Sequence, residues 1–113
     1  MDDCLFCKFV SGEFATNKVY EDSDMIIIND ISPKAPIHML LIPKIHNKFL
    51  HEQTDKEASV LGKCLKKLAD LRCELGLTEG YRLIINQGDN AGQTVPHIHV
   101  HILAGTKMDW NPA

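Results

Sequence analysis

Residues 97–102 read His-Ile-His-Val-His-Ile, and this alternation decides the fold more than any other stretch of the chain. Successive side chains of a β-strand point to opposite faces, so His97, His99 and His101 are expected to line one face and the apolar residues the other. Three of the six histidines of the chain occupy these positions. We therefore predict a strand that anchors in a core and carries a rigid row of imidazoles.

Four further stretches predict strands, because they are rich in β-branched and aromatic residues and are bounded by turn residues. They are residues 18–22, 25–30, 37–42 and 81–87. Ser23 and Asp24 are expected to form a tight turn between the first two, and Pro43 to end the third.

A long helix is predicted between the third and fourth of these strands. Thr54 and Glu57 fit a capping box, in which each side chain bonds the backbone amide of the other. Apolar residues then recur at helical spacing as far as Leu75, and Gly76 stands where a left-handed C-cap is expected. A shorter helix is predicted over residues 4–11.

The arrangement predicts an α+β fold, in which one helix covers one face of a five-stranded antiparallel sheet. The length of 113 residues, with 44% hydrophobic and 24% charged residues, is typical of one globular domain, residues 1–113. The net charge of −3 argues against a nucleic-acid partner. Without a run of roughly 20 apolar residues or a signal-like N-terminus, we expect no membrane partner and a cytoplasmic protein, or a nuclear one in a eukaryote.

The histidine strand and the loop before it together favour phosphate chemistry. Gly92 allows a close approach of the backbone to a ligand, and Gln93 and Thr94 add neutral donors. No Lys or Arg lies between Asn86 and His101, which suits one phosphate better than a triphosphate. The middle histidine, His99, is the natural nucleophile. His101 could orient the phosphoryl oxygens or donate a proton to the leaving group.

Two other interpretations of the histidine row carry less weight. A metal site on the strand itself is disfavoured, because the outer two backbone positions are roughly 13 Å apart. A surface strand with incidental histidines remains the third possibility.

At this point the chain resembles the histidine triad (HIT) superfamily, whose motif alternates three histidines with apolar residues. Further matching segments are Asp30-Ile-Ser-Pro33, His38 ahead of Pro43-Lys44, Gly80-Tyr-Arg82, Asn86, Gly92-Gln-Thr-Val95 and Met108-Asp-Trp110. The resemblance spans about Cys4 to Trp110 and is similar to the Hint branch, the histidine triad nucleotide-binding proteins. One departure is Ala104-Gly105, where many members carry two glycines.

The resemblance implies a homodimer with a ten-stranded sheet that hydrolyses purine nucleoside phosphoramidates without an organic cofactor. His99 would attack the α-phosphorus, and His101, His97 and His38 would assist it. A nucleotide-binding set is implied as well: Leu5, Phe6, Ile28 and Ile31 around the base, Asp30 at the ribose, Gln93 and Thr94 at the phosphate, and Asn29, Asn86, Gly92 and Val95 nearby. Trp110 would reach the site of the partner subunit.

Two alternatives to a purine nucleoside phosphoramidase stay open. One is an adaptor in which a bound nucleotide, AMP or GMP, regulates a protein partner with little turnover. The other is a dinucleoside polyphosphate hydrolase. Transferases that resemble this chain carry Gln at the position of His101, so the histidine found here favours hydrolysis.

The pair Cys4-x-x-Cys7 allows three interpretations: a redox pair, two free thiols, or half of a structural zinc site. A tetrahedral Cys₂His₂ site would need two histidines. Resemblance to bacterial-like HIT proteins implies that His46 and His97 complete it.

Overall fold

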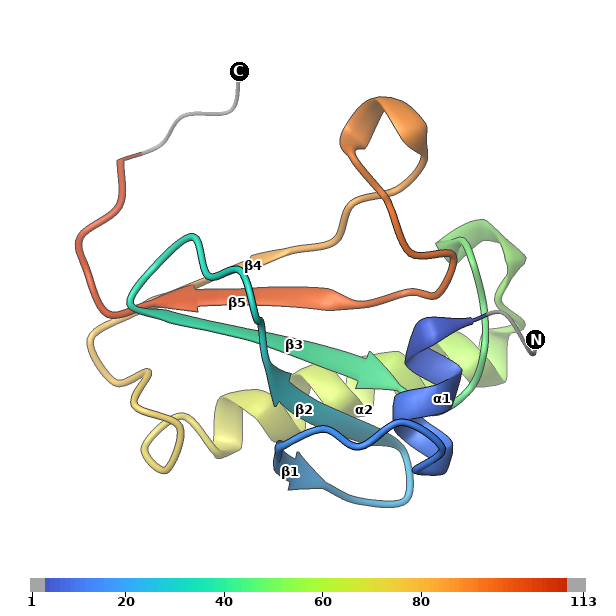
Figure 1. Ribbon diagram of the computed structural model, residues 1–113, viewed down its shortest axis with the longest axis horizontal. Helices are drawn as coiled ribbons and strands as arrows, with labels where there is room; N and C mark the ends of the chain where they lie inside the picture. The colour runs from blue at the N-terminus through green and yellow to red at the C-terminus, as the bar shows by residue number, and fades with distance from the viewer. Residues whose placement is uncertain (1–3, 110–113) are drawn as a thin grey trace.

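The structure is a computed structural model that describes residues 4–109. Its five strands form one antiparallel sheet in the order β1-β2-β3-β5-β4 (Figure 1). The elements are α1 (Leu5–Ser11), β1 (Lys18–Glu21), β2 (Met25–Asn29), β3 (Ile37–Pro43), α2 (Asp55–Asp70), β4 (Tyr81–Ile84) and β5 (Val100–Ala104), with short 3-10 helices at Leu50–Glu52 and Asp89–Ala91. The predicted α+β architecture is confirmed. No helix within residues 4–109 has the length and apolar character needed to cross a membrane.

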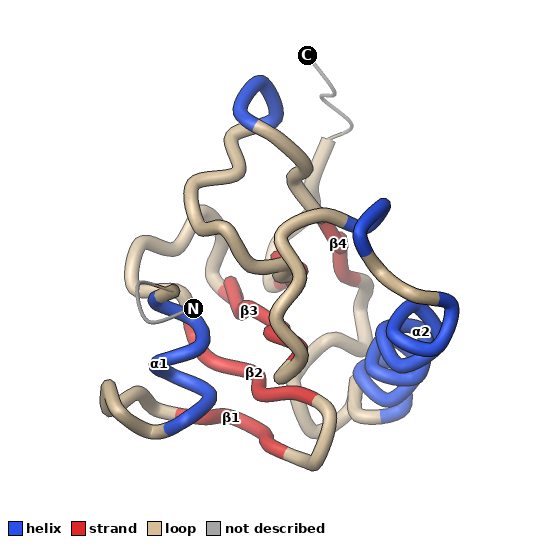
Figure 2. The backbone as a smooth tube through the Cα atoms, turned by 90° about the vertical axis from the view of Figure 1, so that its right-hand side faces the viewer, coloured by secondary structure: helices blue, strands red, loops and turns tan. Residues whose placement is uncertain are grey.

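The sheet has a helix on each face, and the two-residue period of its strands separates two cores (Figure 2). On the α2 face the buried residues include Met25, Ile27, Met39, Leu41, Val100, Ile102, Cys64 and Leu68. On the α1 face they are Cys4, Phe6, Ile26, Ile28, Leu40 and Ile42. Because His38 and His101 alternate with residues of the α2 core, their side chains lie on the α1 face.

The helix α2 is shorter than predicted. Its capping box is present, with Thr54 Oγ1 accepting from the amide of Glu57 and the Glu57 carboxylate accepting from that of Thr54. Regular helix stops at Asp70, where the amide of Leu71 is shared between two carbonyls. A turn then runs to Gly76, which has φ +77° and does cap it.

The cap at Gly76 is a Schellman motif. Its own amide donates to the carbonyl of Cys73, and the amide of Leu77 donates to that of Arg72. Leu77 is buried in the α2 core. The apolar spacing up to Leu75 therefore predicts burial correctly but overestimates the regular helix.

The ends of four strands also differ from prediction, and β1 and β2 each stop one residue early, at Glu21 and Asn29. β3 includes Pro43, which pairs with Met25, and β4 ends at Ile84 rather than at residue 87. β4 is an edge strand whose pairing with β5 extends only to the Ile84–His101 pair.

The most consequential correction concerns the histidine strand, because β5 begins only at Val100. His97 and His99 precede it in irregular backbone. There the amide of His97 donates to the carbonyl of Val95, and the amide of Ile98 to that of Asn47. These bonds replace the sheet ladder, so the three imidazoles do not form one uninterrupted row.

Candidate functional site

His99 lies buried between α1 and β5. Its Nδ1 is 2.8 Å from the carbonyl oxygen of His97, which can only accept, so Nδ1 carries the proton. The other ring nitrogen, Nε2, then holds the free electron pair of a neutral imidazole. The ring of Phe6 packs edge-on against His99, with centroids 4.9 Å apart. His99 is therefore held in the tautomer that a nucleophile requires.

The proton on His101 is positioned by a chain of hydrogen bonds that starts at a backbone amide. The amide of Lys34 donates to Nδ1 of His38 at 2.9 Å, so the proton of His38 is on Nε2. That nitrogen lies 2.9 Å from Nδ1 of His101, which must accept. The remaining nitrogen of His101, Nε2, is thus a donor.

Asp30 also lies beside His38. Its Oδ1 accepts from the amide of Ser32 at 2.7 Å, and its Oδ2 is 3.4 Å from Nε2 of His38. The donor atoms of Asp30, His38 and His101 all lie within 4.8 Å of one another, a spacing that a metal ion would also accept. The amide of Lys34 places a proton on His38 Nε2, however, so the closeness follows from hydrogen bonding.

The surroundings of His101 disfavour its protonated form. Burial, and then the neighbouring His99 and His38, lower the pKa of His101 below its usual value, whereas Asp30 opposes the shift. A neutral imidazole with a proton on Nε2 donates to a phosphate oxygen without carrying a charge of its own.

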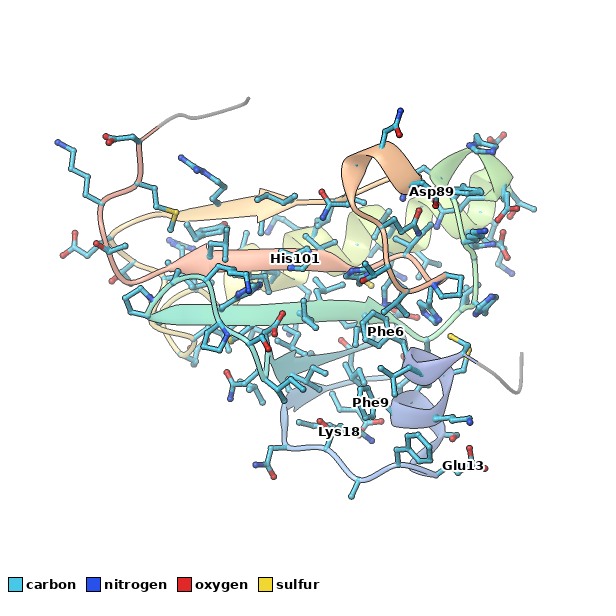
Figure 3. All side chains as sticks on the ribbon, turned by 45° about the horizontal axis from the view of Figure 1, so that its top comes forward. Phe6, Phe9, Glu13, Lys18, Asp89 and His101 are labelled. Atoms are coloured by element: carbon cyan, nitrogen blue, oxygen red, sulfur yellow. The ribbon has the colours of Figure 1, made fainter. Side chains whose placement is uncertain are left out.

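A pocket of about 370 Å³ opens beside these histidines, and we call it the histidine pocket. Its walls come from the β2–β3 loop, β3, β4 and β5: Asp30, Ser32, Lys34, His38, Ile84, Asn86, His101 and Leu103. Figure 3 shows His101 on β5 and Phe6 on α1, the two sides from which a ligand would be held. The structure therefore brings His38, His101, Asp30 and Asn86 together, as predicted for one site.

The residues expected to surround a base lie in two different environments, one buried and one exposed. Phe6 and Ile28 are buried in the α1 core, whereas Leu5 is 39% and Ile31 98% exposed. Asn29 pairs with Met39 and lines a second cavity, together with Asp30, His38 and Glu74. Asn29 therefore lies at a cavity that shares Asp30 and His38 with the histidine pocket.

The side chain of Gln93 holds the loop that precedes the histidines. Oε1 of Gln93 accepts from the amide of Gly88, and Nε2 donates to the carbonyl of Lys48, both at 2.8 Å. Gln93 therefore fastens the loop, which explains its presence without a phosphate. Gly92 has φ +85°, Thr94 is exposed, and Val95 packs against the α1 core.

Cys4, Cys7, His46 and His97 converge at the N-terminus of α1. Nδ1 of His97 is 3.4 Å from Cys4 Sγ, 3.5 Å from Cys7 Sγ and 3.2 Å from His46 Nδ1. Cys7 Sγ is also 3.1 Å from His46 Nδ1. Ligand atoms around tetrahedral Zn²⁺ lie roughly 3.3–3.8 Å apart, so the cluster has nearly the dimensions of such a site.

Protonation in the cluster also suits a cation. Nε2 of His97 donates to the carbonyl of Pro43 at 2.7 Å, which leaves its Nδ1 without a proton and facing the cysteines. Burial lowers the pKa of His97 to about 4. Burial and the adjacent Cys4 raise the pKa of the Cys7 thiol to about 11, so the thiolate needs a cation beside it at neutral pH.

Some residues of the histidine pocket were not predicted from the sequence, and one predicted site residue lies outside the residues that the structure describes. Lys34, Ile84 and Leu103 were not expected there, and the sequence carries no local signal for them because they come from three separate elements. Trp110 lies outside residues 4–109.

Comparisons with known proteins agree on the family. The HIT domain matches residues 11–108, so the chain belongs to the HIT family. Protein HitA of Neisseria gonorrhoeae is 42% identical, with 91% of this chain and 96% of HitA covered. A 14 kDa zinc-binding protein of Brassica juncea is 38% identical, with 97% and 99% covered.

Solved structures give the same result. A HIT family hydrolase from Legionella pneumophila superposes with a TM-score of 0.91 at 40% identity, covering 98% of this chain and 100% of the other. A histidine triad nucleotide-binding protein from Candida albicans reaches 0.80 at 31% identity, covering 98% and 85%.

Proposed function

We propose that the protein is a nucleoside phosphoramidase that cleaves the P–N bond of purine nucleoside 5′-phosphoramidates. The observation that carries this proposal is the 2.8 Å bond from His99 Nδ1 to the His97 carbonyl, which leaves Nε2 free to attack phosphorus. The hydrolase and nucleotide-binding relatives support a nucleotide as the ligand.

The reaction proceeds in two displacements. Nε2 of His99 bonds to the α-phosphorus while the P–N bond breaks, and the nitrogen leaves with the electron pair and takes up a proton from solvent. Water then displaces His99 and releases a proton. Nε2–H of His101 donates to the phosphate oxygens in both steps, where their negative charge develops.

Other residues hold the nucleoside in this proposal. Phe6 and Ile28 lie against the base, and Oδ2 of Asp30, which faces His38, accepts from a ribose hydroxyl. Asn86 lies beside His101 in the histidine pocket and donates to the phosphate.

The decisive variant is His99→Ala. We expect hydrolysis of adenosine 5′-phosphoramidate to fall by on the order of 10³-fold or more, and a rapidly quenched wild-type reaction to show a nucleotidyl adduct by mass spectrometry. His51→Ala is the matched control, since His51 is exposed and stacks only on Phe49. Unchanged turnover in His99→Ala would refute the nucleophile.

The same assay separates the alternative functions. AMP or GMP binding without turnover of any substrate would indicate an adaptor. A higher kcat/KM for diadenosine polyphosphates than for the phosphoramidate would indicate a polyphosphate hydrolase.

We also propose that Cys4, Cys7, His46 and His97 hold a structural zinc ion. The convergence of four ligand atoms and the zinc-binding relative support it. Untagged protein should contain about one zinc per chain, and Cys7→Ser should lower that content. Cys73→Ser is the control, because Cys73 is exposed and lies outside the cluster. Zinc-free protein whose melting temperature does not respond to added Zn²⁺ would refute the site.

A further inference from the structure

Cys4 and Cys7 lie together, apart from the other two cysteines of the chain. Cys64 is buried in the α2 core, across the sheet from α1, and Cys73 is exposed. The sulfurs of Cys4 and Cys7 belong to a cluster whose ligand atoms all lie within 4.8 Å of one another. As zinc ligands they would have one role, and the same closeness gives the metal-free pair a chemistry of its own.

The first turn of α1 sets the two cysteines at a separation that a disulfide tolerates. The amide of Lys8 donates to the carbonyl of Cys4 at 3.1 Å, and the amide of Cys7 donates to Cys4 Sγ at 3.3 Å. Residues three apart in such a turn have Cα atoms roughly 5 Å apart, within the span of about 4.4–6.8 Å found in disulfides. The two sulfurs can therefore meet by side-chain rotation while the helix stays formed.

The two sulfurs differ in exposure, which suits them to different steps. Cys7 is half-buried and can meet a small oxidant, whereas Cys4 is 3% exposed. Redox-sensitive cysteines are often accessible thiols with a resolving thiol beside them. Nδ1 of His97, which carries no proton, lies 3.5 Å from Cys7 Sγ and 3.4 Å from Cys4 Sγ. One imidazole nitrogen can thus accept the proton of either thiol as it reacts.

We propose that Cys4 and Cys7 are a redox modification site, at which hydrogen peroxide converts the two thiols of the metal-free chain into a reversible disulfide. The sulfur of Cys7 takes one oxygen from peroxide as the O–O bond breaks, giving a sulfenic acid and water. The sulfur of Cys4 then attacks that of Cys7, so that the S–S bond forms, the S–O bond breaks and a second water leaves. The thiols lose two electrons and two protons, and the peroxide is reduced to two waters.

Oxidation and zinc binding exclude each other at this pair, because zinc binds thiolates and a disulfide has none. This exclusion rests on the zinc site proposed above, whereas the disulfide itself needs only the two cysteines. The same helix packs Phe6 against His99, and Figure 1 shows α1 beside the end of β3. The oxidised pair would therefore leave α1 without a metal link to His46 and His97.

The test treats chelated, fully reduced protein with hydrogen peroxide and follows its mass and its free thiols. We expect the wild type to lose the mass of two hydrogen atoms, with differential alkylation assigning the loss to Cys4 and Cys7, and dithiothreitol to restore both thiols. Cys73→Ser is the control and should react like the wild type, since Cys73 lies outside the pair. Cys4→Ser should instead gain oxygen at Cys7, which then has no resolving thiol. Zinc-loaded protein should lose the two thiols at least about tenfold more slowly.

The outcomes separate this inference from the zinc site and from the phosphoramidase, because no readout depends on turnover. Zinc-free wild-type protein that gains oxygen atoms without losing the two hydrogens would overturn the redox pair and leave the zinc site intact. A disulfide that maps to Cys73 would overturn it as well. A Cys4–Cys7 disulfide that forms equally fast with Zn²⁺ present would uphold the redox pair and refute the zinc site. The thiol map is made on the wild type, so it decides even if Cys4→Ser fails to fold.

Discussion

His97 is the residue at which the two sites meet. Its imidazole faces Cys4, Cys7 and His46, while its backbone carbonyl accepts from His99. The side chain thus belongs to the proposed zinc site and the main chain to the proposed catalytic centre.

The buried His97 predicts that metal-free protein loses stability in acid. Its pKa is about 4 in the fold and about 6.5 when unfolded, so the unfolded state binds the proton more readily. The stabilisation is complete above about pH 6.5 and is lost as the pH falls towards 4, by about 3 kcal/mol in total. Urea unfolding in the presence of a chelator should show this slope, and His97→Gln should flatten it. An unchanged slope in that variant would contradict the assignment.

Gly105 predicts a second effect at the scale of one residue. It has φ +94°, and a Cβ there would lie 2.9 Å from Cβ of Pro36. Gly12 has φ +85° but open space around it. Both alanine variants should lose about 1 kcal/mol from backbone strain, and Gly105→Ala more because of the clash. Chemical denaturation measures the free energy of unfolding of each variant. Equal losses in the two variants would show that the β2–β3 loop moves to accommodate the new Cβ atom.

Among the elements, α1 depends most on the cysteine and histidine cluster. It has seven residues, too few for a stable isolated helix, and Cys4 is its N-cap. The same helix presents Phe6 to His99. Anything that fastens Cys4 and Cys7 to His46 and His97 therefore also holds one wall of the proposed nucleotide site.

Removing the metal is expected to loosen α1 and weaken nucleotide binding together. Chelation should speed amide hydrogen exchange in Leu5–Ser11 and raise the dissociation constant of AMP, while exchange in α2 stays unchanged. Restoring Zn²⁺ should reverse both effects. Faster exchange throughout α2 as well would indicate general unfolding rather than release of α1.

At the scale of the molecule, the two sheet edges differ in how well they are protected. The β1 edge carries Lys18 and Glu21, which pair with each other and, at Glu21, with Lys44. Charged residues of this kind discourage edge-to-edge pairing. The β4 edge has the same length as β1 but carries one charged residue, Arg82, beside the exposed Leu83. We therefore propose that two copies of the chain pair through β4 and so form a homodimer with a ten-stranded sheet.

This arrangement predicts different effects of one charge at each edge. Leu83→Glu on β4 should shift the protein from a dimer of about twice 12.7 kDa to a monomer in light scattering. Val19→Glu on β1 is the matched control, since Val19 is 41% and Leu83 40% exposed. Dissociation by the β1 variant alone would place the interface at the other edge.

The sequence by itself determined the class of fold and named most of the residues that converge at the two candidate sites. Apolar alternation, the Thr54 capping box and the glycine caps act through neighbouring residues, so their effects are readable locally. The triad motif and the Cys4-x-x-Cys7 pair likewise named the groups that converge. The start of β5 was predicted less well, because the amides of His97 and Ile98 donate to the carbonyls of Val95 and Asn47. The length of α2 was overestimated, because the amide of Leu71 is shared between the carbonyls of Lys67 and Leu68 and a turn follows.

Only the tertiary structure decided which ring nitrogen carries the proton in His38, His97, His99 and His101, and where Lys34 lies. His97 owes its tautomer to the carbonyl of Pro43, and His38 owes its own to the amide of Lys34. Every residue has a backbone carbonyl and, except proline, an amide, so no residue type records these partners. The bond from His97 joins residues 54 apart and the bond between His38 and His101 joins residues 63 apart, so both form only when distant segments pack together. His99 is bonded to the carbonyl of His97 two residues before it, in the irregular backbone that precedes β5.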